Sequence, residues 1–186
     1  MKKSIKILLI SLCSFIIVLG MILGISFAVL TRKTNRINDD FSFIYTDEKY
    51  TNAVGVEGVQ GITQEISCGY AVIEMFSKWN GGTITEQNLF DKYGKVITST
   101  GKSFCNELNK QFPEYQTEIY KYLKNSELID KVYKSLADGI PVPFEWAAKY
   151  EDKWTLHYSL VIRLDIPNDT ITVANPYGYI EYLTIK

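Results

Sequence analysis

The stretch TQEISCGYAVIEMF, Thr63 to Phe76, joins a polar, loop-like run to an apolar run, with Cys68 at the junction. From Cys68 to Trp79 the apolar residues recur at helical spacing, and Asn80-Gly81-Gly82 ends the run. The pattern therefore predicts a helix whose N-terminus lies at or just before Cys68. The partial positive charge of a helix N-terminus favours the thiolate, which is the nucleophilic form of cysteine.

Helical patterns continue up to residue 139. Thr83-Ile-Thr-Glu86 fits a capping box before a short helix, residues 100–112 form another, and a fourth starts with a cap at Ser126 and closes at Gly139. Beyond that glycine the chain has short β-branched and aromatic runs, namely IPVPFEWA, TLHYSLVIRLD, TITVAN and GYIEYLTI. Helices followed by strands predict an α+β domain with the opening helix packed on an antiparallel sheet.

The N-terminal part differs in composition from the rest. An uncharged apolar segment lies between Lys6 and Arg32 and is long enough to cross a bilayer of about 30 Å. It is longer than the usual apolar region of a signal peptide, and no small-x-small cleavage site follows, so we favour an uncleaved signal anchor over a cleaved signal. We interpret Cys13, inside it, as a membrane-facing apolar residue.

These boundaries predict four regions. They are a short basic head (1–6), a transmembrane anchor (7–31), a juxtamembrane stalk (32–54) and a folded domain (55–186). Bases flank the span on both sides, so their distribution does not set the orientation. A short Lys-rich head usually leaves the long C-terminal part outside, and we therefore expect a single-pass membrane protein with an extracellular domain.

Charge excludes one class of partner. The first 36 residues carry six bases and no acid, which leaves 14 basic against 21 acidic residues in the remainder. This acidic balance argues against nucleic acid as a partner of the folded part. With one histidine and no clustered cysteines, we expect neither a zinc site nor another cofactor.

Three residues in chain order suggest thiol chemistry. Cys68 opens a helix, His157 lies within the predicted strand TLHYSLVI, and Asn175 ends the next strand in VANPYG. A hairpin folding about Pro167-Asn168 brings Asn175 near His157, where an amide oxygen accepts the imidazole proton and holds one tautomer. Each residue also has a structural alternative: Cys68 as a core residue or a disulfide partner of Cys105, His157 as an ordinary strand residue, and Asn-Pro as a turn.

The segment SCGYAVIEMF resembles the nucleophile helix of papain-like cysteine peptidases. Three blocks together resemble more closely the bacteriocin-processing, or double-glycine leader, peptidase-like family: Gln64 to Phe76, DGIPVPFEW (Asp138 to Trp146), and LHYSLVIRLD through ITVANPYG. The resemblance spans about residues 60 to 180 and implies a papain-like fold.

The resemblance also implies the roles of individual residues. Cys68 becomes the nucleophile, His157 the general base, Asn175 the orienting residue and Gln64, rather than Gln60, the oxyanion donor together with the Cys68 backbone N–H. Asn175 departs from the many members that have Asp there, which leaves a weak or inactive homologue open. We also expect five residues to line the substrate cleft: Gly69, Tyr70, Glu145, Trp146 and Trp154.

We therefore expect a membrane-anchored cysteine peptidase that acts on a peptide or protein substrate without a cofactor. Peptide, isopeptide and cell-wall peptide bonds all fit this chemistry. Two alternatives remain open: a non-catalytic peptide- or protein-binding module on the same fold, and an acyltransferase or transglutaminase-like enzyme using the same three residues.

Overall fold

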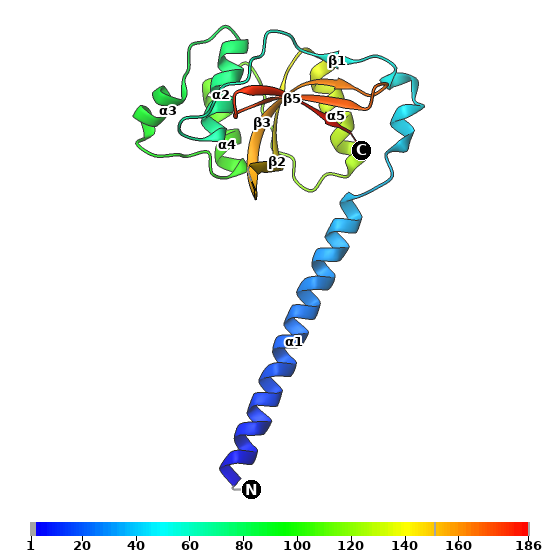
Figure 1. Cartoon of the computed structure of the whole chain (residues 1–186), viewed down its shortest axis with the longest axis vertical. Coiled ribbons are helices and arrows are strands. Elements are labelled where there is room, and N and C mark those ends of the chain that lie inside the picture. The colour runs from blue at the N-terminus through cyan, green and yellow to red at the C-terminus, as the bar shows by residue number, and fades with distance from the viewer. Residues whose placement is uncertain (1–2, 151, 186) are drawn as a thin grey trace.

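The computed structural model describes residues 3–150 and 152–185, as one long helix followed by an α+β domain (Figure 1). Helix α1 (Lys3–Ile37) contains the stretch Ser14–Thr31, which has a mean hydropathy of 2.4 and no buried residue. By length and composition this helix is able to cross a membrane, and a signal sequence passes the same test. The side chain of Cys13 lies outside the described residues.

Polar contacts join the end of α1 to helix α5 (Asn125–Ala137). The Asn125 side-chain amide donates to Asn38 Oδ1 at 2.8 Å, and the Ser126 backbone N–H donates to Asp39 Oδ1 at 3.1 Å. The Ser126 hydroxyl donates to the other Asp39 oxygen, and these bonds lower the pKa of the Asp39 carboxyl. Asp39 therefore caps α5 from a distant part of the chain.

The segment expected as a stalk is largely part of the domain. It forms two short helices, η1 (Ser42–Tyr45) and η2 (Glu48–Tyr50), and the two-residue strand β1 (Val54–Gly55). Ile44 and Tyr50 are buried, with 1% and 3% of their surface exposed. The expectation of a stalk over 32–54 is thus wrong beyond residue 40, because these two side chains complete a core whose other members lie far along the chain.

The four predicted helices are present. They are α2 (Cys68–Trp79), α3 (Glu86–Tyr93), α4 (Gly101–Gln111) and α5. The cap of α3 differs from the expected one: Thr85, not Thr83, accepts the N–H of Asn88, and the Asn88 side chain accepts the N–H of Thr85. The fourth helix begins at Asn125, so Ser126 lies in its first turn and is not the N-cap. The Ser126 N–H is instead satisfied by the Asp39 carboxylate.

The second half forms the expected antiparallel sheet. Its strands are β2 (Val142–Tyr150), β3 (Lys153–Asp165), β4 (Thr170–Asn175) and β5 (Tyr179–Thr184). The first part of β3 pairs with β2, and its second part pairs with β4 on one side and β1 on the other. A register shift between Val161 and Arg163 marks the change. The open edge of β3 near residue 157 is therefore available to another segment.

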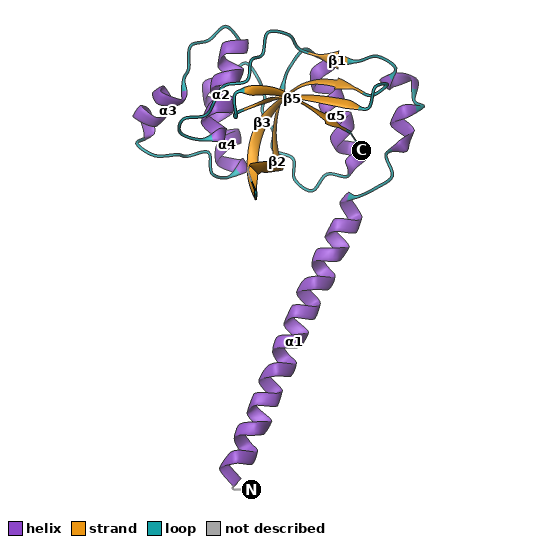
Figure 2. Ribbon diagram, in the orientation of Figure 1, coloured by secondary structure: helices purple, strands orange, loops and turns teal. Residues whose placement is uncertain are grey.

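The sheet separates two hydrophobic cores, with α2 on one side and α5 on the other (Figure 2). Side chains alternate between them along β3: Tyr158 and Leu160 join the α2 core, whereas Val161 joins the α5 core. The α2 core also includes side chains of α4. This packing holds α2 against the strand that carries the histidine and confirms the predicted arrangement of helix and sheet.

Candidate active site

Cys68 is the first residue of α2 and is half-buried. Ser67 is the N-cap, and its hydroxyl accepts the Tyr70 backbone N–H at 3.2 Å. The cap explains why the helix starts here, since serine in an extended conformation satisfies an N–H that has no intrahelical acceptor. The predicted position of the cysteine at the helix N-terminus is confirmed.

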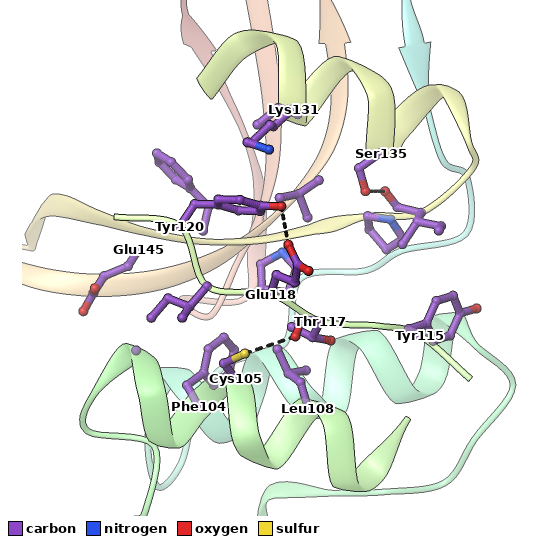
Figure 3. Close-up of a pocket in the computed structure, with 18 of the residues that line it drawn as sticks. Phe104, Cys105, Leu108, Tyr115, Thr117, Glu118, Tyr120, Lys131, Ser135 and Glu145 are labelled. Atoms are coloured by element: carbon purple, nitrogen blue, oxygen red, sulfur yellow. Dashed lines mark hydrogen bonds between the residues drawn. The ribbon is translucent and has the colours of Figure 1, made fainter. Parts of the chain in front are cut away.

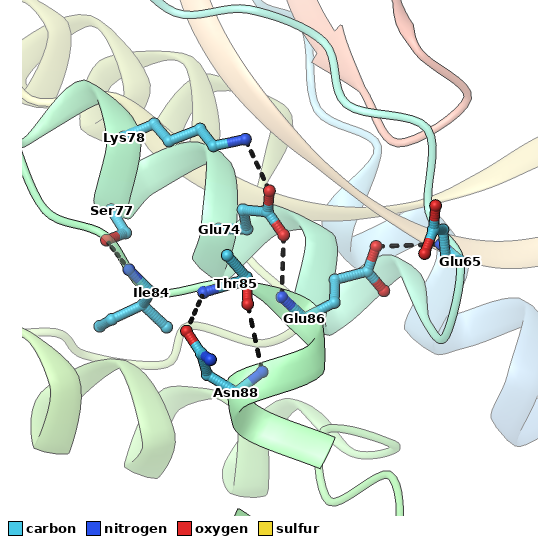
Figure 4. A network of polar contacts seen from close by, with 8 residues as sticks. All are labelled: Glu65, Glu74, Ser77, Lys78, Ile84, Thr85, Glu86 and Asn88. Atoms are coloured by element: carbon cyan, nitrogen blue, oxygen red, sulfur yellow. Dashed lines mark hydrogen bonds and ion pairs between the residues drawn. The ribbon is translucent and has the colours of Figure 1, made fainter. Parts of the chain in front are cut away.

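The loop before Cys68 is held by a buried carboxylate from α3 (Figure 4). Glu86 Oε1 accepts the backbone N–H of Glu65 at 3.0 Å, and Oε2 accepts those of Ile66 at 3.0 Å and Ser67 at 2.9 Å. The Glu86 N–H in turn donates to Glu74 Oε2 at 2.8 Å. In the sequence, Glu86 fits only a capping box, and no spacing indicates that a residue 18 positions after the cysteine fixes its loop.

His157 and Asn175 lie side by side and are buried, with 2% and 1% of their surface exposed. The imidazole Nε2 is 3.0 Å from Asn175 Oδ1. The hairpin between β3 and β4 turns over residues 166–169, where the sequence predicted it. The expected proximity of the two side chains is therefore present.

Two further contacts fix the orientation of the Asn175 amide. The Tyr177 backbone N–H, which is only a donor, donates to Asn175 Oδ1 at 3.0 Å. Asn175 Nδ2 donates at 2.8 Å to Glu181 Oε2, which accepts. With the amide oxygen facing the ring, Nε2 must carry the hydrogen, and Nδ1 is left as the basic nitrogen.

The surroundings of His157 also control its charge. Burial lowers the pKa of the imidazole below its ordinary value, whereas the Asn175 hydrogen bond and the Glu181 charge act upward. The Tyr177 ring stacks on the imidazole, with 4.3 Å between centroids and 14° between planes. His157 is thus held as a neutral, oriented base. Sequence reasoning missed Glu181 and Tyr177, although both follow Asn175 closely in the chain.

Two contacts bring the segment before α2 to this end of the sheet. Thr63 forms an antiparallel bridge with Tyr177, and the Gln64 N–H donates to the Pro176 carbonyl at 2.7 Å. Burial raises the pKa of the Tyr158 phenol, and nearby Glu145 and Cys68 raise it further. Gln64 thus lies beside the residue after Asn175, and Cys68 packs against the hydrophobic core that includes Tyr158.

Gln64 has an unusual side chain. Its Oε1 is buried and has no hydrogen-bond partner within the part of the chain that the structure describes. Gln60, the other glutamine considered, is exposed. The backbone of Gln64 is fixed by Pro176, whereas its buried side-chain oxygen accepts no hydrogen bond from the described residues.

Two of the expected cleft residues lie in the interior. Tyr70 is fully buried, and its hydroxyl donates to the Lys95 carbonyl at 2.9 Å. The expectation that Tyr70 lines the cleft is wrong, because its position in the first turn of α2 turns the ring into the core. Gly69 is also buried, and a Cβ there would stand 2.4 Å from Thr98 Oγ1, so this glycine permits close packing rather than substrate contact.

The other three expected cleft residues line two cavities. Glu145 borders a cavity of about 730 Å³ between α4, β2 and the segment 114–123 (Figure 3). Trp146 and Trp154 border a smaller one of about 200 Å³ together with Asn175. Trp146 is half-buried and donates to Ser159 Oγ at 3.0 Å, whereas Trp154 is 72% exposed.

Cys105 lines the larger cavity together with Glu145. Its thiol donates to the Thr117 carbonyl at 3.4 Å, and burial raises the pKa of the thiol. Cys68 and Cys105 are both free, so the alternative of a disulfide between them is wrong.

Comparison with known proteins yields one match. The sequence model of the Peptidase_C39 like family matches residues 56–184. No curated protein and no solved structure matches the chain significantly. The matched residues contain α2, which begins at Cys68, β3 with His157, and β4, which ends at Asn175.

Proposed function

The chain belongs to the Peptidase_C39 like family, and on that premise we propose that it hydrolyses peptide or amide bonds with a Cys68-His157-Asn175 triad. The observation that carries the proposal is the 3.0 Å contact between His157 and an Asn175 amide whose orientation two other groups determine. A structural histidine needs no such arrangement, whereas a general base needs one defined tautomer.

The proposed reaction has two stages, acylation of the cysteine and hydrolysis of the thioester. His157 Nδ1 takes the proton of the Cys68 thiol while the sulfur attacks the substrate carbonyl carbon, and the C=O electron pair moves to the oxygen. When the tetrahedral intermediate collapses, the C–N bond breaks and the leaving amine takes the proton from Nδ1. Water then gives a proton to Nδ1 and its oxygen attacks the thioester carbonyl carbon. When this second tetrahedral intermediate collapses, the C–S bond breaks, the acid is released and the cysteine sulfur takes the proton back from Nδ1. Throughout, Asn175 holds the Nε2–H.

The oxyanion is proposed to form between two N–H donors. Glu86 accepts the three backbone N–H groups before Cys68 but not that of Cys68 itself, which as the first residue of α2 has no intrahelical acceptor. The Gln64 side-chain amide supplies the second donor. In other acyl-transfer enzymes, removal of one such donor raises the activation free energy by about 3 kcal/mol. Two donors therefore account for a large part of the rate enhancement.

We further propose that α1 is an uncleaved anchor and that the domain lies outside the cytoplasmic membrane. The uncharged stretch of α1 and the short basic head before it support this. Protease added to intact cells that express the chain is expected to digest the domain. Protection of the domain until the cells are lysed would contradict this orientation.

The decisive experiment is digestion of a peptide library by the full chain in detergent micelles, followed by mass spectrometry. The wild type is expected to cleave, and Cys68→Ala is expected to lose at least roughly 10⁴-fold in rate. Cys105→Ala is expected to retain activity, because the contacts of that thiol are with the Thr117 carbonyl and the Asn109 side-chain amide and not with the proposed triad. Equal cleavage by wild type and Cys68→Ala would refute the assignment.

Two measurements separate the alternative functions. Iodoacetamide is expected to label Cys68 faster than Cys105, and His157→Ala is expected to slow that labelling. A binding module on the same fold has no reason for either result. If an added primary amine is joined to the acyl fragment in preference to water, the chain is an acyltransferase rather than a hydrolase.

A further inference from the structure

The side of the domain that faces α1 carries exposed apolar side chains. Trp154 and Leu156, in the β2–β3 hairpin, are 72% and 70% exposed, and Tyr120 and Tyr122, in the loop that enters α5, are 50% and 76% exposed. We call these four residues the anchor-side face. Large aromatic side chains with this exposure are unusual on a surface that meets only water and commonly mark a contact site.

The structure places this face near the end of the proposed anchor. The tip of the β2–β3 hairpin and the loop that enters α5 are the parts of the domain that reach furthest toward α1 (Figure 1). Both end at about the level of the upper end of that helix. Directly after α1, Asn38 and Asp39 contact the start of α5, so the chain enters the domain beside the loop that leads into α5.

Helix geometry gives the height of the face above the bilayer. The apolar stretch ends at Thr31 and α1 continues to Ile37, six residues further, or about 9 Å at 1.5 Å per residue. A headgroup layer adds roughly 5–8 Å to each side of the hydrocarbon core. The hairpin tip therefore lies at the outer boundary of the headgroups, within reach of an indole or phenol ring.

We propose that the anchor-side face rests on the headgroup region of the bilayer that α1 crosses. The inference depends on the membrane anchoring in the proposed function. Tryptophan and tyrosine suit this location because each has an apolar ring and a polar group. The sequence from 149 to 153 contains two lysines and two acidic residues, so the contact needs no anionic lipid.

The placement restricts the substrate. His157 follows Trp154 by three positions in β3, about 10 Å along a strand. The triad thus stands close to the membrane surface, where an extended polypeptide that is bound to the bilayer or leaving it is the accessible substrate class. A soluble protein that does not contact the bilayer does not gain this access to the triad.

Tryptophan fluorescence tests the contact in the full chain. The protein is placed in zwitterionic phosphatidylcholine vesicles whose lipids carry bromine near the headgroup or deep in the acyl chain. Of the three tryptophans, Trp154 is expected to be quenched, more strongly by shallow than by deep bromine, and Trp154→Phe is expected to remove most of the quenching. Trp79→Phe, at the C-terminal end of α2, is the matched control and is expected to keep it.

The outcomes separate the two proposals. If carbonate washing extracts the chain, α1 is no anchor and the face has no bilayer to contact. If the chain stays in the membrane but Trp154→Phe leaves the quenching unchanged, the anchor stands and the face proposal fails. It also fails if Trp154 emission responds to protein concentration and not to brominated lipid, which would indicate contact with a second copy of the chain.

Discussion

Replacement of Glu86 by glutamine tests whether a remote carboxylate holds the nucleophile loop. The two carboxylate oxygens accept three backbone N–H groups, from residues 65, 66 and 67, at 2.9–3.0 Å, and the side chain is 5% exposed. A glutamine has one oxygen and one NH₂ group. Whichever way it turns, its NH₂ group faces at least one N–H donor, so at least one buried donor loses its acceptor.

The magnitude follows from these contacts. A hydrogen bond to a charged group contributes about 1.5–3 kcal/mol, and a buried donor left without an acceptor costs about 1–3 kcal/mol. Because glutamine keeps one acceptor and avoids the burial of a charge, we expect Glu86→Gln to lower the free energy of unfolding by roughly 2–4 kcal/mol. For a chain of this length that corresponds to a decrease in Tm of roughly 5–15 °C.

Thermal unfolding of the full chain in micelles, followed by circular dichroism, measures the effect. Glu57→Gln is the matched control, because Glu57 is exposed and this change is expected to stay within about 0.5 kcal/mol of the wild type. Peptide cleavage is expected to decrease in Glu86→Gln even well below its Tm, since the loop positions Gln64 and Cys68. If Glu86→Gln unfolds within about 0.5 kcal/mol of the wild type, the carboxylate does not hold the loop and this reasoning fails.

Three more predictions use the same structure. His157 is the only histidine, and burial lowers its pKa below 6.5, so the unfolded chain binds more protons than the folded chain just below that pH. The free energy of unfolding, measured from pH 8 to 5, should therefore decrease below about pH 6.5 in the wild type. It should not do so in His157→Gln, which lacks the imidazole. Because the Glu181 charge acts to raise the pKa of His157, NMR titration of this imidazole should give a lower midpoint in Glu181→Gln, and an unchanged or higher midpoint would contradict the role given to Glu181. Gly69→Ala should lower the free energy of unfolding by about 1–3 kcal/mol in chemical denaturation, because the new methyl group meets Thr98. Adding Thr98→Ala to the same chain should recover part of that loss. If the losses of the two single variants simply add in the double variant, there is no clash between these residues.

Local patterns were sufficient to predict much of this protein. Apolar spacing predicted α2 from Cys68 to Trp79, and the β-branched runs after Gly139 predicted the antiparallel strands. Both follow from periodicity, which each segment contains on its own. The cysteine, the histidine and the asparagine were also found by sequence, since each lies at the end or in the middle of a regular element. Their catalytic roles stay predictions.

Caps and segment boundaries were less predictable. The capping residues of α3 and the burial of Ile44 and Tyr50 differed from expectation, and Tyr70 proved to be a core residue. In each case a contact with a distant part of the chain decided between locally acceptable alternatives. Thr83 and Thr85, for example, both fit an N-cap by type, and only the fold selects Thr85.

The amino-acid sequence by itself determined the elements and the three reactive residue types, because helix and strand periodicity and side-chain chemistry are local properties. Only the tertiary structure decided how those residues are held. Glu86 reaches the loop before Cys68, Glu181 and the Tyr177 N–H set the Asn175 amide, and Asp39 caps α5 across 87 positions of the chain. A hydrogen bond depends on distance and direction in space, which the order of residues along the chain does not contain.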